Sequence, residues 1–167
     1  MDKQQLRDMM NKKRQSLSQS DVNVCSRAIL ERFGSEVSLS HVQHAHVYQA
    51  NSSRREVNTS YFMSYIEEKS SGSIVHIPAD SPSARKDSIE FDLIIVPLLA
   101  FDADCNRLGL GAGWYDAFLA SQPKALKVGL AYDFQYVSRV PVETHDIPLD
   151  IIITQSATFQ PSTRSVS

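Results

Sequence analysis

Residues 92–116 read DLIIVPLLAFDADCNRLGLGAGWYD, and this segment predicts most of the fold. It begins with an almost continuous apolar run, Asp92–Val96, which is the pattern of a strand covered on both faces. Alternating glycines follow at 109–113, and the residues after them predict a helix from about Trp114 to Ala120. A buried strand that leads through a glycine-rich turn into a helix is typical of a parallel sheet flanked by helices. We therefore expect this segment to form the centre of an α/β fold.

The rest of the chain continues the alternation of helices and strands. Apolar residues at helical spacing predict helices over 2–16, from the capping pair Ser18 and Asp21 to Gly34, and from Asn58 or Thr59 to Lys69. Short apolar runs predict strands at 44–49, 74–77, 126–132 and 150–154. The polar stretch 79–91 has no periodicity and is expected to be a connection. The pattern predicts a single α/β domain over 1–167, a three-layer sandwich with a mostly parallel central sheet.

The composition excludes several classes of protein. The 167 residues are 42% apolar and 22% charged, as in an ordinary globular domain. The longest apolar run, 93–101, contains a proline and is too short to cross a bilayer, and the first residues lack the apolar stretch of a secretory signal. Two cysteines make neither a disulfide framework nor a zinc site, and the net charge of −2 argues against nucleic-acid binding. We expect a cytoplasmic protein with no membrane or nucleic-acid partner.

Half of the six glycines in the chain, Gly109, Gly111 and Gly113, fall in one short loop. Alternating glycines before a helix let the backbone aim several N–H groups at one point, an arrangement that binds phosphate. Arg107 just upstream adds a forked cation, and Asp116 in the first helical turn suits a helix cap or a divalent cation. The loop therefore predicts a phosphate site, with a purely structural glycine turn as the alternative.

Familiar phosphate and cation motifs do not account for this loop. No glycine precedes a lysine, as a Walker loop requires, and Trp114 stands where the dinucleotide fingerprint needs its third glycine. The triplet Asp102, Asp104 and Asn106 opens like a calcium loop, but Arg107 replaces the glycine that such a loop needs. The predicted phosphate site is therefore of another type.

The predicted first helix is basic although the chain as a whole is acidic. Residues 1–14 contain two aspartates but five basic residues, which are Lys3, Arg7, Lys12, Lys13 and Arg14. A basic helix on an acidic body can serve one anionic ligand. A solvated helix face is the other interpretation.

The motif Arg-Leu-Gly-x-Gly-x-Gly-aromatic-Tyr-Asp at 107–116, preceded by DLIIVPLLAFD at 92–102, closely resembles the 5-formyltetrahydrofolate cyclo-ligase family, also called 5,10-methenyltetrahydrofolate synthetases. Further segments carry the resemblance in the family's order. They are Lys3-x-x-Leu6-Arg7 with Arg14, Tyr48 with Glu56-Val57-x-Thr59, and Ala131-Tyr132-x-x-Gln135 followed by Val140-Pro141-x-Glu143-x-His145-Asp146 and Leu149-Asp150. Because these matches keep their order, the resemblance is specific.

The resemblance implies a fold like that of the sugar-phosphate isomerase and CoA-transferase group, and a ligase that uses ATP and Mg²⁺. Members of the family close 5-formyltetrahydrofolate to 5,10-methenyltetrahydrofolate with release of ADP and phosphate. The γ-phosphoryl group is transferred to the formyl oxygen, a neighbouring folate nitrogen attacks, and phosphate leaves. Such a transfer needs positioning and charge neutralisation more than a strong base. The implied partners are ATP and a reduced folate, and we expect the protein to act as a monomer.

The resemblance also implies roles for individual residues. It gives catalytic roles to Lys3, Arg7 and Arg107. It gives ATP contacts to Lys3, Arg7 and the loop residues Arg107, Leu108, Gly109, Leu110, Gly111, Ala112, Gly113, Trp114 and Tyr115. It gives folate contacts to Asn51, Glu56 and Trp114, and Mg²⁺ ligation to Asp116 and Asp146. His145, next to this last aspartate, is interpreted as a structural or surface residue.

Two departures from the family pattern bear on function. Trp114 stands where tyrosine is usual, which keeps an aromatic face but loses a hydroxyl. The stretch 79–91 is short, and in the family this region helps to wall the folate pocket. Two alternatives therefore stay open. One is a non-catalytic or repurposed nucleotide-binding relative, and the other is a sugar-phosphate isomerase-like protein, which would need a base near the loop that the sequence does not show.

Overall fold

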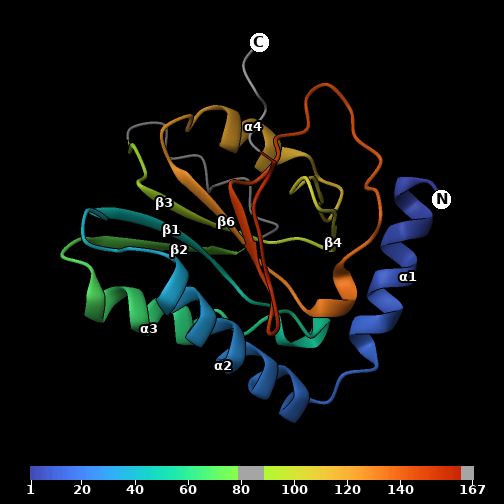
Figure 1. Ribbon diagram of the computed structural model, residues 1–167, viewed down its shortest axis with the longest axis horizontal. Coiled ribbons are helices and arrows are strands. Elements are labelled where there is room, and N and C mark those ends of the chain that lie inside the picture. Colours follow the sequence, from blue (N-terminus) through green and yellow to red (C-terminus); the bar gives the residue numbers. More distant parts are fainter. Residues whose placement is uncertain (79–88, 163–167) are drawn as a thin grey trace.

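The computed structural model describes residues 1–78 and 89–162 and has a six-stranded sheet at its centre, in the order β2-β1-β3-β6-β7-β8 (Figure 1). The strands are β1 (His44–Gln49), β2 (Ser73–Pro78), β3 (Leu93–Val96), β6 (Leu126–Leu130), β7 (Ile151–Ile153) and β8 (Thr158–Phe159). Each neighbouring pair is parallel except β7 with β8. The predicted mostly parallel sheet is confirmed, and β3 is buried along its whole length, as its apolar sequence indicates.

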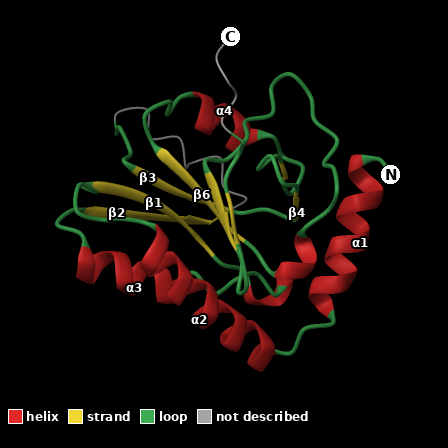
Figure 2. Ribbon diagram, viewed as in Figure 1, coloured by secondary structure: helices red, strands yellow, loops and turns green. Residues whose placement is uncertain are grey.

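Helices cover both faces of this sheet (Figure 2). α2 (Gln19–Glu36) and α3 (Ser60–Lys69) lie together on one face, and α4 (Trp114–Ala120) lies on the other, which confirms the predicted layers. α1 (Lys3–Gln15) lies outside the layers, where it packs on a short hairpin and on the 3₁₀ turn η1 (Ser52–Arg54). The first helix is therefore placed at the edge of the sheet rather than over its face.

Local signals place the start of α2 correctly but not its end. Ser18 and Asp21 form the predicted capping box, with the Asp21 N–H 3.0 Å from the Ser18 hydroxyl oxygen. Gly34, predicted as the end of the helix, lies inside it, because α2 continues to Glu36. A Cβ at Gly34 would lie 3.0 Å from the Tyr65 hydroxyl oxygen. The glycine therefore serves the close packing of α3 on α2 rather than helix termination.

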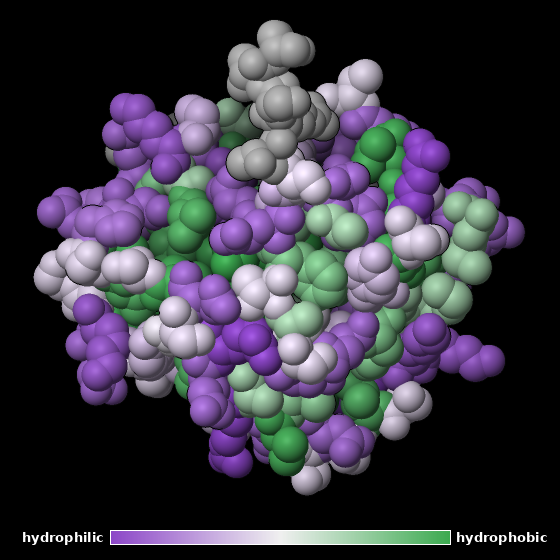
Figure 3. Space-filling view, viewed as in Figure 1, coloured by the Kyte–Doolittle hydropathy of each residue, from purple (hydrophilic) through white to green (hydrophobic). Residues whose placement is uncertain are grey.

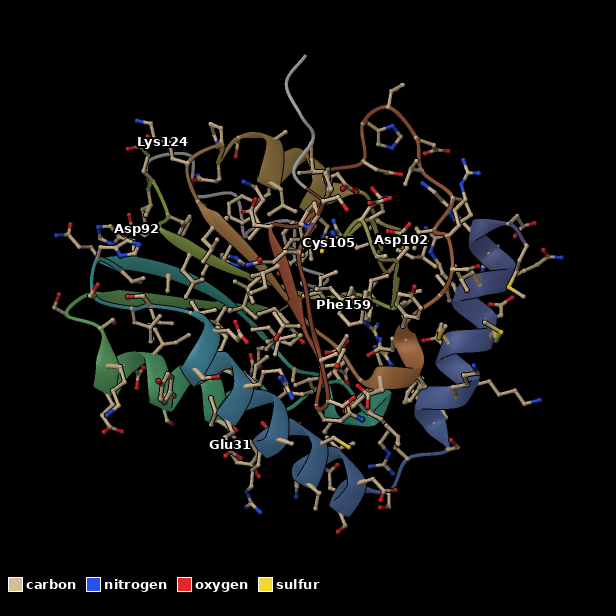
Figure 4. The ribbon with its side chains drawn as sticks, in the orientation of Figure 1. Glu31, Asp92, Asp102, Cys105, Lys124 and Phe159 are labelled. Carbon is tan, nitrogen blue, oxygen red and sulfur yellow. The ribbon has the colours of Figure 1, made fainter. Side chains whose placement is uncertain are left out.

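A hairpin that the sequence pattern does not reveal connects β3 to the glycine loop. Its strands, β4 (Ala100–Phe101) and β5 (Arg107–Leu108), pair antiparallel. Asp102 and Cys105 lie in its turn, and the Cys105 thiol donates to the Phe159 carbonyl at 3.4 Å (Figure 4). Burial raises the pKa of Cys105 to about 12, so this thiol stays protonated at neutral pH and is structural.

A small apolar cluster fixes α1 on this hairpin. Its members come from the helix, the hairpin and the segment near residue 140, and they are Leu6, Met10, Leu99, Ala100, Leu108 and Val140. Because Leu6 and Met10 are buried, the orientation of α1 is set, and Lys3 and Arg7 are turned toward the glycine loop.

The face of the molecule in Figure 3 is mainly hydrophilic, with apolar side chains scattered among polar ones. Over the part of the chain that the structure describes, no helix has both the length and the apolar character needed to cross a bilayer. Most of the predicted connection 79–91 lies outside the described residues, at 79–88. Its last residue, Phe91, is buried in the main core.

His46 in β1 is a fully buried polar side chain. Its ring packs against Phe91, Tyr115 and Phe118, with ring centroids 5.5, 6.1 and 4.8 Å away. Neither ring nitrogen has a hydrogen-bond partner among the described residues. Burial lowers the pKa of His46 from 6.5 to about 4, so the ring is neutral in the folded protein at pH 7.

We expect the free energy of unfolding to fall by about 2 kcal/mol between pH 7 and pH 5 because of His46. The pKa of His46 is lower in the folded protein than in the unfolded chain. The stability that the neutral ring contributes is therefore fully present above pH 6.5 and is lost as the pH falls toward about 4. Urea unfolding at the two pH values measures this loss. His46→Phe, which keeps the aromatic packing, should remove most of it, whereas His41→Phe at an exposed position should not. The same pH dependence in wild type and His46→Phe would contradict the assignment.

Candidate active site

A cavity of about 310 Å³ lies beyond the end of β3, where a parallel sheet offers its ligand site. It is lined by Lys3, Arg7, Pro97, Arg107, Leu108, Gly109, Leu110, Gly111, Ala112, Gly113, Trp114, Tyr115, Asp116, Glu143, His145 and Asp146. These residues come from α1, the end of β3, the glycine loop with the start of α4, and the segment before β7. The residues predicted for catalysis, ATP contact and metal ligation therefore meet around one cavity.

The glycine loop uses backbone that other residues rarely adopt. Gly111 has φ +112° and Gly113 has φ +74°, both in the left-handed region. A Cβ on Gly109 would lie 2.6 Å from Arg107 Nη1, and one on Gly111 would lie 3.5 Å from the Arg7 guanidinium. The glycines are thus needed both for the course of the loop and for the close approach of two arginines.

Arg107 is the most deeply buried cation on the cavity wall, because only 3% of its side chain is exposed. Its Nη2 donates to Asp116 Oδ1 at 3.2 Å, and its guanidinium lies 5.8 Å from the centre of the Tyr115 ring. Its Nε has no hydrogen-bond partner among the described residues, and burial lowers its pKa. A buried guanidinium that is only partly paired is costly unless an anion completes its contacts.

Lys3 and Arg7 close the cavity from the side of α1. Arg7 Nε donates to the Gly109 carbonyl at 3.0 Å, which links the helix to the glycine loop. Lys3 Nζ lies 2.8 Å from Asp146 Oδ2 and 3.2 Å from Glu143 Oε2. Burial acts to lower the pKa of Lys3, but these two carboxylates outweigh it and raise the pKa. Lys3 is therefore charged and held in place.

Glu143, His145 and Asp146 form an acidic corner of the cavity, with one ligand atom from each within 4.8 Å of the others. His145 is mostly exposed, as predicted, but it joins this corner through its Nε2, 3.2 Å from Glu143. Asp116 lies outside this group: its Oδ1 accepts from Arg107 and from the Ile147 N–H at 3.1 Å. The carboxylates are hard oxygen donors of the kind that suits Mg²⁺.

Glu56 lies in a second, much smaller cavity of about 10 Å³, which shares Pro97 and Leu110 with the larger one. Its Oε2 accepts the Asn51 N–H at 2.6 Å. Arg14 also lines this space, with Tyr48 and Tyr132. Burial lowers the pKa of Arg14, although the negative charge of Glu56 opposes that shift. The predicted folate residue is thus next to the main cavity rather than inside it.

The sequence analysis counted Arg14 in the basic first helix and in the family resemblance but gave it no site role of its own, although its spacing offered a signal. Lys3, Arg7 and Arg14 follow one another at helical intervals, so they share one side of α1. Trp114 lines the main cavity and stacks on Tyr115 with ring centroids 4.0 Å apart. Asn51 lines none of the described cavities; its side-chain oxygen accepts from the Ser53 N–H at 3.0 Å and so caps η1.

Comparison with solved structures identifies the fold. The NMR structure of Aquifex aeolicus 5,10-methenyltetrahydrofolate synthetase covers 100% of this chain and is itself covered over 97%, with a TM-score of 0.78 and 24% identity. A 5,10-methenyltetrahydrofolate synthetase from Mycoplasma pneumoniae gives a TM-score of 0.74 over 93% of this chain and 99% of its own, again at 24% identity. This chain therefore has the same layered fold as these two solved structures.

Sequence comparison adds closer relatives over a shorter range. The 5-formyltetrahydrofolate cyclo-ligase of Escherichia coli K12 is 44% identical over 71 residues, which is 41% of this chain and 39% of the relative. That of Haemophilus influenzae is 48% identical over 67 residues, or 38% of this chain and 36% of the relative. The chain thus matches less than half of the length of these curated relatives.

The family model described as the 5-formyltetrahydrofolate cyclo-ligase family matches residues 55–155. This range is more than half of the chain, and it includes Glu56, the whole glycine loop and Asp146. Because this match covers more than half of the chain, the chain belongs to the 5-formyltetrahydrofolate cyclo-ligase family.

Proposed function

We propose that this protein uses ATP to close 5-formyltetrahydrofolate to 5,10-methenyltetrahydrofolate, with release of ADP and phosphate. One observation carries the proposal: the buried Arg107, whose Nε has no hydrogen-bond partner in the described part of the chain, lines a single cavity with Lys3 and Arg7 beside the glycine loop. Cations and loop N–H groups that converge on one space suit a polyphosphate ligand. Membership of the cyclo-ligase family supports ATP as that ligand and a reduced folate as the second substrate.

In this proposal the chain contributes binding and charge rather than a base. Arg107 and Arg7 hold the phosphates, and they neutralise charge on the γ-phosphoryl group as it moves to the formyl oxygen. Lys3, which is kept charged by Asp146 and Glu143, lines the same cavity, and its proposed role is to stabilise the transferred group. The neighbouring folate N–H then attacks the carbon of the O-phosphorylated formyl group. A C–N bond forms, the C–O bond breaks with phosphate as the leaving group, and the proton of the attacking nitrogen leaves with the phosphate.

Asp116 and Asp146 would hold Mg²⁺, with Glu143 as a further oxygen donor in the acidic corner. The ion would neutralise phosphate charge when bound. Asp116 also has a role that needs no metal, because its Oδ1 holds the Arg107 guanidinium at 3.2 Å. Its carboxylate therefore orients the most deeply buried cation of the site.

The cavity at Glu56 favours a second candidate function. At about 10 Å³ it does not admit a ring-sized ligand in this state, so the alternative is a nucleotide-binding relative that does not use folate. A spectroscopic assay separates the two. Purified protein with ATP, Mg²⁺ and 5-formyltetrahydrofolate should develop the absorbance of the methenyl product, and a sample without ATP should not. Binding of ATP without any such absorbance would favour the alternative.

A further inference from the structure

A third cavity, of about 340 Å³, lies between α1 and η1 and is not used by the proposed reaction. We call it the outer groove, and it is lined by Asn11, Gln15, Arg54, Leu99 and Leu110. Gln15 Nε2 donates to the Ser53 carbonyl at 3.0 Å, so the helix and the turn are joined at its wall. The outer groove therefore combines an arginine, side-chain amides and apolar side chains.

The outer groove is adjacent to both other cavities through a single side chain. Leu110 lines the phosphate cavity, the Glu56 cavity and the outer groove. It belongs to the glycine loop and is only partly buried. A ligand that reaches from Glu56 past Leu110 would therefore enter the outer groove.

The segment 51–56 places one charged side chain at the Glu56 cavity and another at the outer groove. The Asn51 N–H donates to Glu56 Oε2 at 2.6 Å, and the Asn51 carbonyl accepts the Arg54 N–H at 3.1 Å. Between them Arg55 has φ +54°, a left-handed conformation that reverses the course of the chain. As a result Glu56 lines the Glu56 cavity, while Arg54 lines the outer groove.

The positive charge of Arg54 is close enough to affect Arg14, which lines the neighbouring Glu56 cavity. Burial is the main reason that the pKa of Arg14 is lowered, and the nearby Arg54 charge adds to that shift. An anionic group bound in the outer groove would therefore meet a region of positive potential. Asn11 and Gln15 carry side-chain N–H donors that suit a carboxylate.

The substrate of the proposed reaction has matching ends. Its reduced pterin carries the reacting formyl group, and its other end is an aminobenzoyl ring that bears a glutamate with two carboxylates. Resting on the proposed function, we propose that the outer groove binds this tail, with Arg54 paired to a glutamate carboxylate and Leu99 and Leu110 against the aminobenzoyl ring. Arg54 is then a specificity-determining residue, which selects folates that carry a tail.

Isothermal titration calorimetry on the full chain tests this assignment by comparing two ligands. The first is 5-formyltetrahydrofolate, and the second is a 5-formyltetrahydropterin that lacks the aminobenzoylglutamate. Arg54→Gln should raise the Kd for the first ligand about tenfold, because a charge-assisted contact is lost. It should leave the Kd for the second ligand and for ATP unchanged. Arg54→Lys, which keeps the charge, should recover part of the loss.

Arg55→Gln is the matched control. Arg55 is the neighbouring arginine, its Nη1 donates to Gln19 at 3.1 Å, and it lines none of the described cavities. The proposal predicts no change in Kd for this variant. Equal losses in the Arg54 and Arg55 variants, or an equal loss with the ligand that has no tail, would overturn it.

Binding and turnover are read separately, so the two proposals can fail independently. Tail-dependent binding that responds to Arg54, without formation of the methenyl product, supports the outer groove and contradicts the cyclo-ligase activity. Formation of the methenyl product, with a folate Kd that does not change in the Arg54 variants, supports the cyclo-ligase activity and contradicts the role of the outer groove. A wild-type protein that binds neither folate ligand overturns both proposals.

Discussion

Arg107→Ala is expected to lower kcat/KM for ATP by about two to three orders of magnitude, the range found when one preorganised donor to a developing charge is removed. The side chain lines the cavity and is 3% exposed, and its one hydrogen bond within the described residues is that to Asp116, so most of its N–H donors are left for a bound anion. Steady-state kinetics with ATP varied at saturating folate measures the loss. Calorimetric titration of ATP shows how much of the loss lies in binding.

Two further variants, Arg107→Lys and Arg27→Ala, test whether the loss depends on the guanidinium group and on its position in the site. The lysine keeps the charge but lacks the fork that grips phosphate oxygens, so we expect an intermediate loss. Arg27 is an exposed arginine on α2 that lies over the Tyr61 ring, 5.2 Å from its centre, and its removal should leave the kinetics unchanged. Thermal unfolding of each variant separates lost function from lost folding. Unchanged kinetics in a folded Arg107→Ala protein would refute the role given to the glycine loop.

Asp102→Ala should destabilise the protein by about 3–5 kcal/mol, as expected when the acceptor of several buried donors is removed. The Asp102 carboxylate accepts the Asp104 and Asn106 N–H groups, each at 3.1 Å, the Asn106 amide at 3.2 Å, and the Val140 N–H at 3.0 Å. It is 4% exposed, so water does not replace these contacts. Equilibrium urea unfolding measures the change.

The control for Asp102 is its neighbour Asp104, whose side chain is exposed. Asp104→Ala removes a carboxylate from the same turn and should change stability by less than about 0.5 kcal/mol. Asp102→Asn, which keeps one oxygen acceptor, should fall between the two. A loss for Asp102→Ala no larger than that for Asp104→Ala would show that the hairpin does not depend on this carboxylate.

Residues 92–96 are an example of structure that the local sequence pattern predicts correctly. Their apolar sequence predicts a strand covered on both faces, and β3 at 93–96 is buried at each position in the centre of the sheet. The same holds for the capping pair Ser18 and Asp21, because both contacts lie within one helical turn. These predictions succeed because the free energy that selects the structure comes from neighbours in the sequence or from simple burial.

Gly34 and the β4–β5 hairpin show where local pattern fails. A glycine near a helix end usually marks a C-cap, but here the contact of Tyr65 with Gly34 decides its use. The two-residue strands of the hairpin are too short to have a periodicity of their own. Asp102 fixes them partly through Val140, which lies 38 residues away in the sequence.

The sequence by itself determined the alternation of the longer helices and strands and the glycine loop with Arg107, because alternation, capping and glycine conformations act over a few residues. Only the tertiary structure decided that Lys3 pairs with Asp146, which is 143 residues away in the sequence, and that Arg14 is buried beside Glu56. It also decided that three separate cavities meet at the side chain of Leu110. These outcomes depend on how Leu6 and Met10 dock α1 on the hairpin. Packing between distant segments sets which charges are buried and which meet, and no local pattern carries that information.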